Sequence, residues 1–314
     1  MKSLRQGLGR QPQGGTMAKL YVVATPIGNL SDMTPRAIET LKNVDLIAAE
    51  DTRVTRALLN HFGIDTPTIS NHQHNEEHRA SSLPQRMLEE ELDVAVVTDA
   101  GTPCISDPGS VLVREAAALG IEVLAVPGPT AMASALSVSG FDTREFAFYG
   151  FLPRQKKELR EKLIAMKKSG VPVGVVHESP HRVIELVRVI SETLPGCLIS
   201  ASCDLTKLYE KTIRGTADEV LDMLESNEKA EKGEYCLVLD MSGVELEVES
   251  EKTSASLEAQ LFEEMMAGCD LRLASQTLTE RGYKRNEVYK ARTNVQRFFD
   301  DMMSEYEQED EDDE

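Results

Sequence analysis

Three loops of this 314-residue chain combine glycine and proline directly after apolar runs, as loops that hold a small polar ligand do. They are TPIGNLSD at 25–32, TDAGTPCISDPG at 98–109 and PGPTA at 127–131. Glycine lets the backbone approach a ligand closely, and proline fixes the shape of a loop. Asp99 adds a carboxylate that could accept hydrogen bonds from ribose hydroxyls or from an amine. One such loop is more often a plain turn, but three on successive strands favour a ligand site.

Other common ligand motifs are missing from the sequence. No G-x-G-x-x-G follows a strand and no G-x-x-x-x-G-K-[ST] occurs, so dinucleotide-binding and P-loop classes lose their main support. The five cysteines form no C-x-x-C pair, and no His/Cys cluster has metal-ligand spacing. We therefore expect free thiols, a cytoplasmic protein and no required metal.

The elements that must position these loops alternate between strand and helix. In the first domain, over 17–135, apolar runs predict strands at 20–25, 44–50, 94–100 and 121–127, with helices from Thr34, over 52–62 and over 108–119. Continuous apolar strands separated by helices predict a mostly parallel sheet covered on both faces. Ligands of such sheets bind at the carboxyl ends of the strands, where the three loops lie.

A second α/β domain is predicted over 140–242. Its strands are expected at 146–151, 171–177, 198–204 and 234–241, its helices at 155–168, 180–194 and 217–226, and an antiparallel strand within 206–216. The remaining ranges are a flexible leader (1–16), a linker (243–256), a helical region that contacts RNA (257–300) and a disordered acidic tail (301–314). The last two helices resemble a helix-turn-helix, although plain packing produces the same outline. No apolar run is long enough to span a membrane.

The net charge of −19 argues at first against a nucleic-acid partner, since polyanion binding needs a basic surface. Ten of the acids lie in the last fifteen residues, which hold no base and leave −9 for the rest of the chain. Residues 154–168 hold seven bases against two acids, and residues 270–299 hold seven against three. Solvated helix faces are the alternative explanation. The candidates for phosphate contact are Arg154, Lys156, Lys157, Arg160, Arg281, Lys284, Arg285 and Lys290.

Aromatic residues make up only 5% of the chain, and it has no Trp. Stacking of bases on several aromatic side chains is therefore not expected. Recognition of a folded RNA through its shape and phosphates fits the composition better.

The chain resembles one family along nearly its whole length. TPIGNL, EDTR at 50–53, DAGTP, PGPTA, GFLPR at 150–154, ESPHR at 178–182, LTK at 205–207 and KGEY at 232–235 occur in the order found in the ribosomal RNA small subunit methyltransferase I family. That family is a branch of the tetrapyrrole methylase superfamily. Cobalamin and sirohaem methylases share the fold but lack EDTR and GFLPR.

The resemblance implies two α/β domains with a cofactor cleft between them, plus the helical C-terminal region. It implies S-adenosylmethionine-dependent 2′-O-methylation of a cytidine in the decoding centre of 16S rRNA, within the small ribosomal subunit, by a homodimer. Carried over by position, the cofactor-binding residues are Pro26, Asp99, Ala100, Gly101, Thr102, Thr130, Ala131, Glu178, Ser179 and Gly233.

A ribose hydroxyl is a poor nucleophile until its proton leaves, so a positioned base or cation is expected. The catalytic candidates are Glu50, Asp51, Arg53, His74, Arg182 and Lys207. Several of them have a simpler explanation. Asp51 or Thr52 could cap a helix, and Glu178 or Ser179 could begin one. No single base is favoured.

Two positions depart from the family pattern. His177 stands where an aromatic residue precedes Glu-Ser, and Cys203-Asp204 stands where Arg-Glu precedes Leu-Thr-Lys. The missing arginine leaves Arg182 and Lys207 as the cations that could compensate. Two other functions stay open, which are a small-molecule methylase acting on a tetrapyrrole and a non-catalytic module that binds the ribosome.

Overall fold

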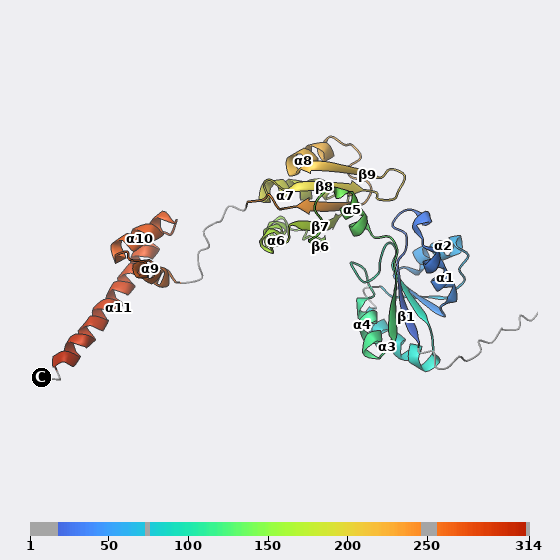
Figure 1. Cartoon of the computed structure of the whole chain (residues 1–314), viewed down its shortest axis with the longest axis horizontal. Helices are drawn as coiled ribbons and strands as arrows, with labels where there is room; N and C mark the ends of the chain where they lie inside the picture. Colours follow the sequence, from blue (N-terminus) through green and yellow to red (C-terminus); the bar gives the residue numbers. More distant parts are fainter. Residues whose placement is uncertain (1–17, 73–75, 246–255, 312–314) are drawn as a thin grey trace, which may run out of the picture. The chain divides into compact units, whose positions relative to one another are not determined.

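The computed structural model describes residues 18–72, 76–245 and 256–311. It divides into two compact units, residues 1–245 and 246–314 (Figure 1). The first unit contains two sheets with their helices, and the second consists of helices. Two α/β halves and a helical C-terminal region confirm the predicted fold class.

The first sheet contains five parallel strands in the order β3-β2-β4-β1-β5. They are β1 (Lys19–Val23), β2 (Leu46–Ala49), β3 (Thr68–Ser70), β4 (Val94–Val97) and β5 (Glu122–Val126). The connecting helices are α1 (Pro35–Asn43), α2 (Thr52–His61), α3 (Glu76–Glu90) and α4 (Ser110–Ala118). Because β4, β1 and β5 are neighbours, the three glycine- and proline-containing loops leave the sheet side by side, as predicted.

Alternate residues of each central strand face opposite helical layers. Val23 of β1 packs in the core formed with α1 and α2, whereas Leu20 packs in the core formed with α3 and α4. Both faces of the sheet are therefore covered, which explains the continuous apolar runs. The α1 helix begins as its sequence predicts, with Thr34 accepting a hydrogen bond from the amide of Ala37 and Pro35 at the first helical position.

The second sheet has the order β6-β7-β10-β8-β9. Its strands are β6 (Phe146–Phe151), β7 (Val173–Glu178), β8 (Leu198–Cys203), β9 (Lys211–Thr216) and β10 (Tyr235–Asp240). Only β6 and β7 are parallel, and β10 inserts antiparallel between β7 and β8. The predicted antiparallel strand within 206–216 is confirmed as β9. The helices of this half are α6 (Lys156–Lys168), α7 (Val183–Thr193) and α8 (Ala217–Glu225).

The α5 helix (Ala131–Ser139) crosses the predicted end of the first domain at 135. Ala135 and Leu136 are buried against Val173, Val175 and Val238 of the second sheet. The chain therefore passes to the second half directly after the loop at 127–130, earlier than predicted. The α7 helix also begins later than predicted, at Val183, because residues 180–182 form a turn.

The helical unit consists of α9 (Leu257–Met266), α10 (Leu271–Glu280) and α11 (Arg285–Glu311), packed around Leu261, Leu278 and Val295. Residues 301–311, within the range predicted to be a disordered acidic tail, continue α11 in this structure. Adding a residue to an existing helix costs little, and Glu and Gln are good helix formers. A run of like charge therefore did not end the helix.

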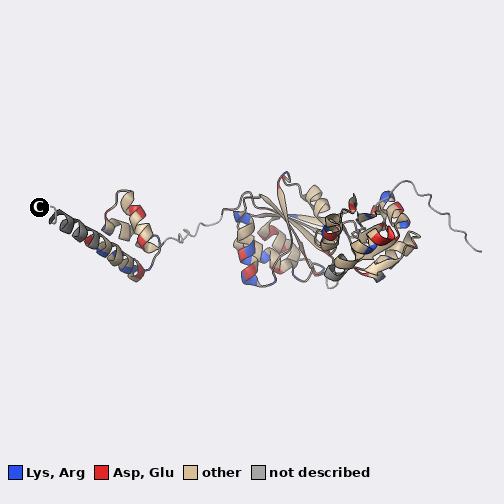
Figure 2. Ribbon diagram, turned by 90° about the horizontal axis from the view of Figure 1, so that it is seen from below, with Lys and Arg blue, Asp and Glu red and all other residues tan. Residues whose placement is uncertain are grey.

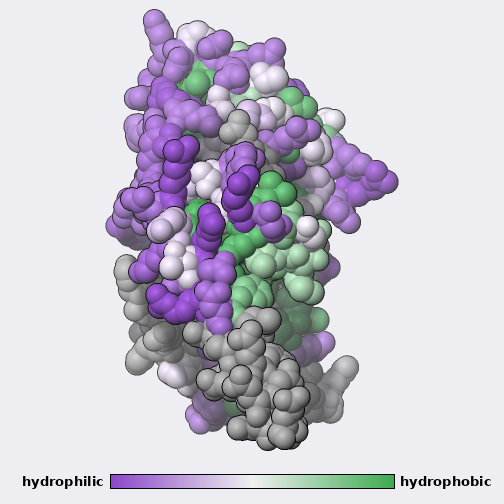
Figure 3. Space-filling model, turned by 90° about the vertical axis from the view of Figure 1, so that its left-hand side faces the viewer, coloured by the Kyte–Doolittle hydropathy of each residue, from purple (hydrophilic) through white to green (hydrophobic). Residues whose placement is uncertain are grey.

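On the face drawn in Figure 3, hydrophilic residues cover most of the area, and apolar residues gather in one part of it. No helix among the described residues is long and apolar enough to cross a membrane.

Candidate functional site

The loops after β1 and β4 are joined at the carboxyl ends of their strands. The amide of Thr25 donates to the carbonyl of Gly101 over 2.9 Å, and the amide of Gly101 donates back to Thr25 over 3.0 Å. The Thr25 hydroxyl also donates to the carbonyl of Thr98, at 3.1 Å. Gly101 has φ of 86°, which a side chain rarely permits, so the pairing depends on glycine there.

The loop after β1 also meets a turn of the second half. A Cβ atom at Gly28 would lie 2.5 Å from Cγ of Lys207, closer than two carbon atoms can approach. Glycine at position 28 therefore lets the Lys207 side chain cross the loop. This contact places Lys207 beside the carboxyl ends of the first sheet.

A cavity of about 430 Å³ lies where these segments meet. Its wall combines the loop after β1, one face of α2, the loop after β4 and two residues of the second half. The lining residues are Pro26, Ile27, Gly28, Leu30, Val54, Thr55, Ala57, Leu58, His61, Thr98, Asp99, Ala100, Lys207 and Glu234. Pro26, Asp99, Ala100 and Lys207 are thus brought together as candidate residues.

Acidic groups at the ends of β2 and β4 fix each other's positions. Glu50 accepts hydrogen bonds from the Thr98 hydroxyl and from the amide of Asp99, the latter at 3.2 Å. Asp99 accepts in turn from the amide of Asp51 at 3.1 Å. Burial, more than the neighbouring acids, raises the pKa of Asp99 above its ordinary value.

Asp51 has the structural role that the sequence left open. It caps α2 by accepting from the amide of Arg53 at 2.8 Å, and it pairs with the Arg53 guanidinium at 2.6 Å. The side-chain hydrogen bonds from Arg53 lower the pKa of Asp51 to about 2. A carboxyl this acidic is a poor proton acceptor, so Asp51 and Arg53 position the start of α2.

Asp107 belongs to this acidic group but was not among the predicted site residues. Burial raises the pKa of its carboxyl to about 6, and the negative charges of Glu50 and Asp99 add to the effect. Its position within TDAGTPCISDPG was the sequence signal that could have identified it as a site residue. Its distance in sequence from Glu50 hid the interaction.

Lys207 lies between two carboxylates. Its ammonium is 3.0 Å from Asp204 and 2.9 Å from Glu234. Burial lowers its pKa, but the hydrogen bonds to Glu234 and Asp204 outweigh this and leave the pKa raised. Lys207 is therefore a cation at neutral pH. A Cβ atom at Gly233 would lie 2.5 Å from Asp204, so glycine is needed for this turn to pack against the segment before β10.

Glu178 and Arg182 form a buried pair at the end of β7. The Glu178 side chain is fully buried, accepts from the amide of Ser179 at 2.8 Å, and lies 3.3 Å from the Arg182 guanidinium. Arg182 also donates to the carbonyl of Pro153 at 3.1 Å, which links ESPHR to GFLPR. None of these residues lines the 430 Å³ cavity.

The two departures from the family pattern occupy ordinary packing positions. His177 makes edge-on ring contacts with Phe148 and Phe151, with centroids 5.2 and 5.8 Å apart, and burial lowers its pKa. It thus packs as the expected aromatic residue would. Cys203 is half-buried beside Tyr235, and burial raises the pKa of its thiol.

The remaining candidate residues lie at different places in the chain's structure. Thr102 and Thr130 lie close in space, since the Thr102 hydroxyl is 3.5 Å from the carbonyl of Pro129. Thr130 precedes the first residue of α5, Ala131, which packs against the core of the second sheet. His74 lies outside the described residues.

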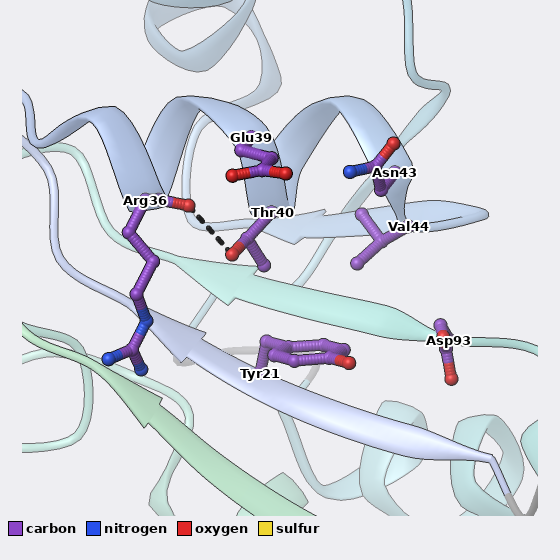
Figure 4. Close-up of a pocket in the computed structure, with 7 residues that line it drawn as sticks. All are labelled: Tyr21, Arg36, Glu39, Thr40, Asn43, Val44 and Asp93. Atoms are coloured by element: carbon purple, nitrogen blue, oxygen red, sulfur yellow. Dashed lines mark hydrogen bonds between the residues drawn. The ribbon is translucent and has the colours of Figure 1, made fainter.

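A smaller cavity of about 190 Å³ lies under α1, away from these loops (Figure 4). It is bordered by Arg36, Glu39, Thr40 and Asn43 of α1, by Val44 directly after that helix, and by Tyr21 and Asp93. It contains none of the predicted site residues. The larger cavity is therefore the candidate site.

Comparisons with known proteins identify relatives of this chain. Residues 19–221 match the family model of tetrapyrrole (corrin/porphyrin) methylases. A ribosomal RNA small subunit methyltransferase I of Bacillus subtilis (strain 168) is 41% identical over 278 residues, covering 88% of this chain and 94% of the relative. The protein of that name from Escherichia coli O157:H7 is 37% identical, covering 89% of this chain and 96% of the relative.

The chain belongs to the ribosomal RNA small subunit methyltransferase I family. A crystal structure of diphthine synthase shares the fold, with a TM-score of 0.57 at 11% identity over 73% of this chain and 92% of that one. The chain is thus a methyltransferase of the tetrapyrrole methylase fold.

Both basic segments of the methyltransferase carry acidic residues among their basic ones (Figure 2), and several of their cations form ion pairs. On α6, Lys156 lies 3.5 Å from both Glu185 and Glu192, and Arg160 also pairs with Glu192. On the helical unit, Arg281 pairs with Glu264 at 2.5 Å. Exposed pairs of this kind are weak, so a phosphate can compete for the same cations.

The remaining candidates for phosphate contact are exposed. Lys157 lies 3.9 Å from Glu161, and Lys284 lies 3.5 Å from Glu287. The exposed set also includes Arg154, Arg285 and Lys290. These side chains can reach a polyanion without breaking a buried interaction.

Replacing Asp107 by asparagine should stabilise the methyltransferase at pH 7. The carboxyl has a pKa of about 6 in the folded chain and 3.8 as the ordinary value. Rising pH therefore deprotonates the unfolded chain first, and the folded state loses stability between these two values. Asp107→Asn should remove this penalty, worth up to about 3 kcal/mol at pH 7 and less than about 1 kcal/mol at pH 4.

Urea unfolding of both proteins at the two pH values measures the difference. Asp142→Asn is the control, because an exposed ion pair with Arg144 lowers the pKa of Asp142 to about 2. It should give no gain at pH 7. An equal gain from Asp107→Asn at both pH values would contradict the assigned cause.

Proposed function

We propose that this methyltransferase uses S-adenosylmethionine to methylate the 2′-hydroxyl of a cytidine in the decoding centre of 16S rRNA. The observation that carries the proposal is the cavity that brings Asp99 of the first sheet together with the cation of Lys207. The names of the relatives, and the resemblance along the chain, support RNA of the small subunit as the substrate.

The residues around this cavity fit S-adenosylmethionine. Asp99 offers a carboxylate for ribose hydroxyls, and the paired backbone of Thr25 and Gly101 leaves room beside it. We assign the cofactor contacts to Pro26, Asp99 and Ala100, which line the cavity, and to Gly101 beside them. The family resemblance alone supports further contacts by residues outside this lining, which are Thr102, Thr130, Ala131, Glu178, Ser179 and Gly233. When bound, the cofactor supplies a methyl group activated on a sulfonium.

The residues of the chain must orient the ribose and favour loss of the proton from its 2′-hydroxyl. Lys207 is protonated at neutral pH, so we assign it the role of a cation that stabilises negative charge on the ribose oxygen. Asp51, with a pKa of about 2, does not act as the base. Glu50 is held by Thr98 and Asp99, which suits a positioning role. Asp99 lines the cavity without an ion pair to Lys207, whereas Glu234, the other carboxylate of the lining, is paired with that cation.

We further propose that the enzyme acts as a homodimer in the cytoplasm and that the basic residues of α6 and of the helical unit contact phosphates. Phosphate contacts give affinity without reading sequence, so the site itself must select the nucleotide. The body without its last fifteen residues still carries −9. Docking is therefore restricted to surfaces where bases gather.

Purified small subunits from a strain lacking this enzyme should incorporate labelled methyl from S-adenosylmethionine. The label should map to a single cytidine and make the adjoining phosphodiester resistant to alkali, since that cleavage needs a free 2′-hydroxyl. Label on the base would mean that the methyl group is transferred to a base atom instead of the ribose 2′-oxygen. Subunits that bind the protein without taking up label would support a non-catalytic module, and transfer to a tetrapyrrole would support a small-molecule methylase.

A further inference from the structure

The segment from Asp204 to Glu210, which follows β8, forms a tightly held turn. The amide of Lys207 donates to the backbone carbonyl of Asp204 over 2.9 Å, and the amide of Glu210 donates to the backbone carbonyl of Lys207 over 3.1 Å. The Glu210 carboxylate accepts from the amide of Thr206 at 2.7 Å. The turn is thus closed by its own backbone and by one side chain.

The turn contains two non-glycine residues in the left-handed region. Asp204 has φ of 52° and Thr206 has φ of 66°, and a β-branched residue is rarely found there. Such strain persists only where surrounding contacts fix the conformation. Here the ion pairs of Lys207 with Asp204 and Glu234 provide that support.

This strained turn presents two large apolar side chains to solvent. Leu208 is 86% exposed and Tyr209 is 82% exposed, more than any other large apolar side chain described in the first unit. Their neighbours Glu210 and Lys211 are exposed and charged. Within this turn, the exposed apolar surface therefore belongs to these two side chains.

The pair lies at the rim of the candidate site. Lys207, directly before Leu208, lines the cavity and crosses Gly28. The strand register places the turn at the same end of the second sheet as Glu178, because Tyr235 of β10 pairs with both Glu178 and Cys203. Leu208 and Tyr209 therefore follow directly in the chain the residue whose side chain lines the cavity.

We propose that Tyr209, supported by Leu208, stacks on a nucleobase next to the nucleotide being methylated and so positions the RNA strand at the cavity. The proposal rests on the proposed function, since it assumes that RNA enters this site. A flat ring held on a fixed backbone loses little freedom when a base covers it. Single-stranded segments of folded RNA are commonly held by stacking on such a ring.

A second copy of the chain is the other candidate partner, and the observations favour it less. A stable protein interface buries about 1,200–2,000 Å² in total, whereas one aromatic side chain supplies about 150–250 Å². The charged residues that surround the pair do not extend it to the size a dimer needs. A single base, in contrast, covers one ring.

The test compares Tyr209→Ala and Tyr209→Phe with the unchanged enzyme on unmodified small subunits. We expect Tyr209→Ala to raise KM for the subunit by about 5- to 150-fold, the range of stacking contributions measured by alanine substitution. Tyr209→Phe keeps the ring and should stay within about twofold. The maximal rate and the Kd for S-adenosylmethionine, measured by calorimetry, should not change in either variant.

Phe146→Ala serves as the matched control. Phe146 is 42% exposed and lies at the opposite end of the second sheet, where it pairs with Val173. An equal rise of KM in this variant would overturn the proposal, as would a loss in Tyr209→Phe as large as in Tyr209→Ala. A lower sedimentation coefficient of Tyr209→Ala without RNA would assign the pair to a second copy instead.

Direct binding separates this inference from the proposed function. If the unchanged enzyme transfers no methyl group, the function fails, but co-sedimentation with small subunits still measures contact with RNA. Weaker co-sedimentation of Tyr209→Ala alone would support stacking. Equal co-sedimentation of the two proteins would overturn it.

Discussion

Replacing Asp99 by alanine should weaken the binding of S-adenosylmethionine by about 10- to 100-fold. A hydrogen bond to a charged group contributes about 1.5–3 kcal/mol, and each 1.4 kcal/mol is a factor of ten in the dissociation constant. Asp99 lines the cavity at the end of β4, and burial already raises the pKa of its carboxyl. Calorimetry with the purified chain measures the affinity.

Alanine at this position also removes the acceptor for the amide of Asp51, so a second variant is needed. Asp99→Asn keeps that acceptor and loses only the charge, which should reduce the affinity by a smaller factor. Asp45→Asn is the control, because Asp45 likewise accepts from a backbone amide, that of Asp93, at 2.9 Å. If Asp99→Ala bound the cofactor as tightly as the unchanged chain, the assignment of Asp99 would be wrong.

The carboxyl edge of the first sheet was predictable because its strands are continuous apolar runs. β1, β4 and β5 each leave a clear run in the sequence, and parallel strands must end on the same side. The short strand β3 (Thr68–Ser70) leaves no such run and was missed. So was α3 (Glu76–Glu90), which contains Pro84 in its interior.

The candidate site was predictable in its loops but not in its cross-contacts. The side chain of Lys207 crosses Gly28, and Glu50 holds Thr98, through contacts between distant segments that no local pattern encodes. The position of α5 on the second sheet is a further case. Its small apolar residues suit either sheet, and only packing decides which one.

The loss of Arg182 should destabilise the fold more than the loss of any exposed cation. Arg182 is the ion-pair partner of Glu178, whose side chain is fully buried. Removing one member of a buried pair leaves an uncompensated charge and costs about 3–5 kcal/mol. Arg182→Ala should therefore reduce the free energy of unfolding by an amount of this order, measured in urea at pH 7.

Two further variants separate the charge from the packing of the side chain. Arg188→Ala is the control on α7, since Arg188 is 38% exposed in its pairs with Glu185 and Glu225 and should cost less than about 1 kcal/mol. With Glu178→Gln in place, position 178 carries no buried charge. Arg182→Ala should then reduce the free energy of unfolding by a clearly smaller amount. Equal costs in the two backgrounds would show that Arg182 acts through its bond to Pro153 and its packing. The expected coupling would instead show that Arg182 stabilises the second half chiefly by neutralising the buried charge of Glu178, in addition to its bond to Pro153 in GFLPR.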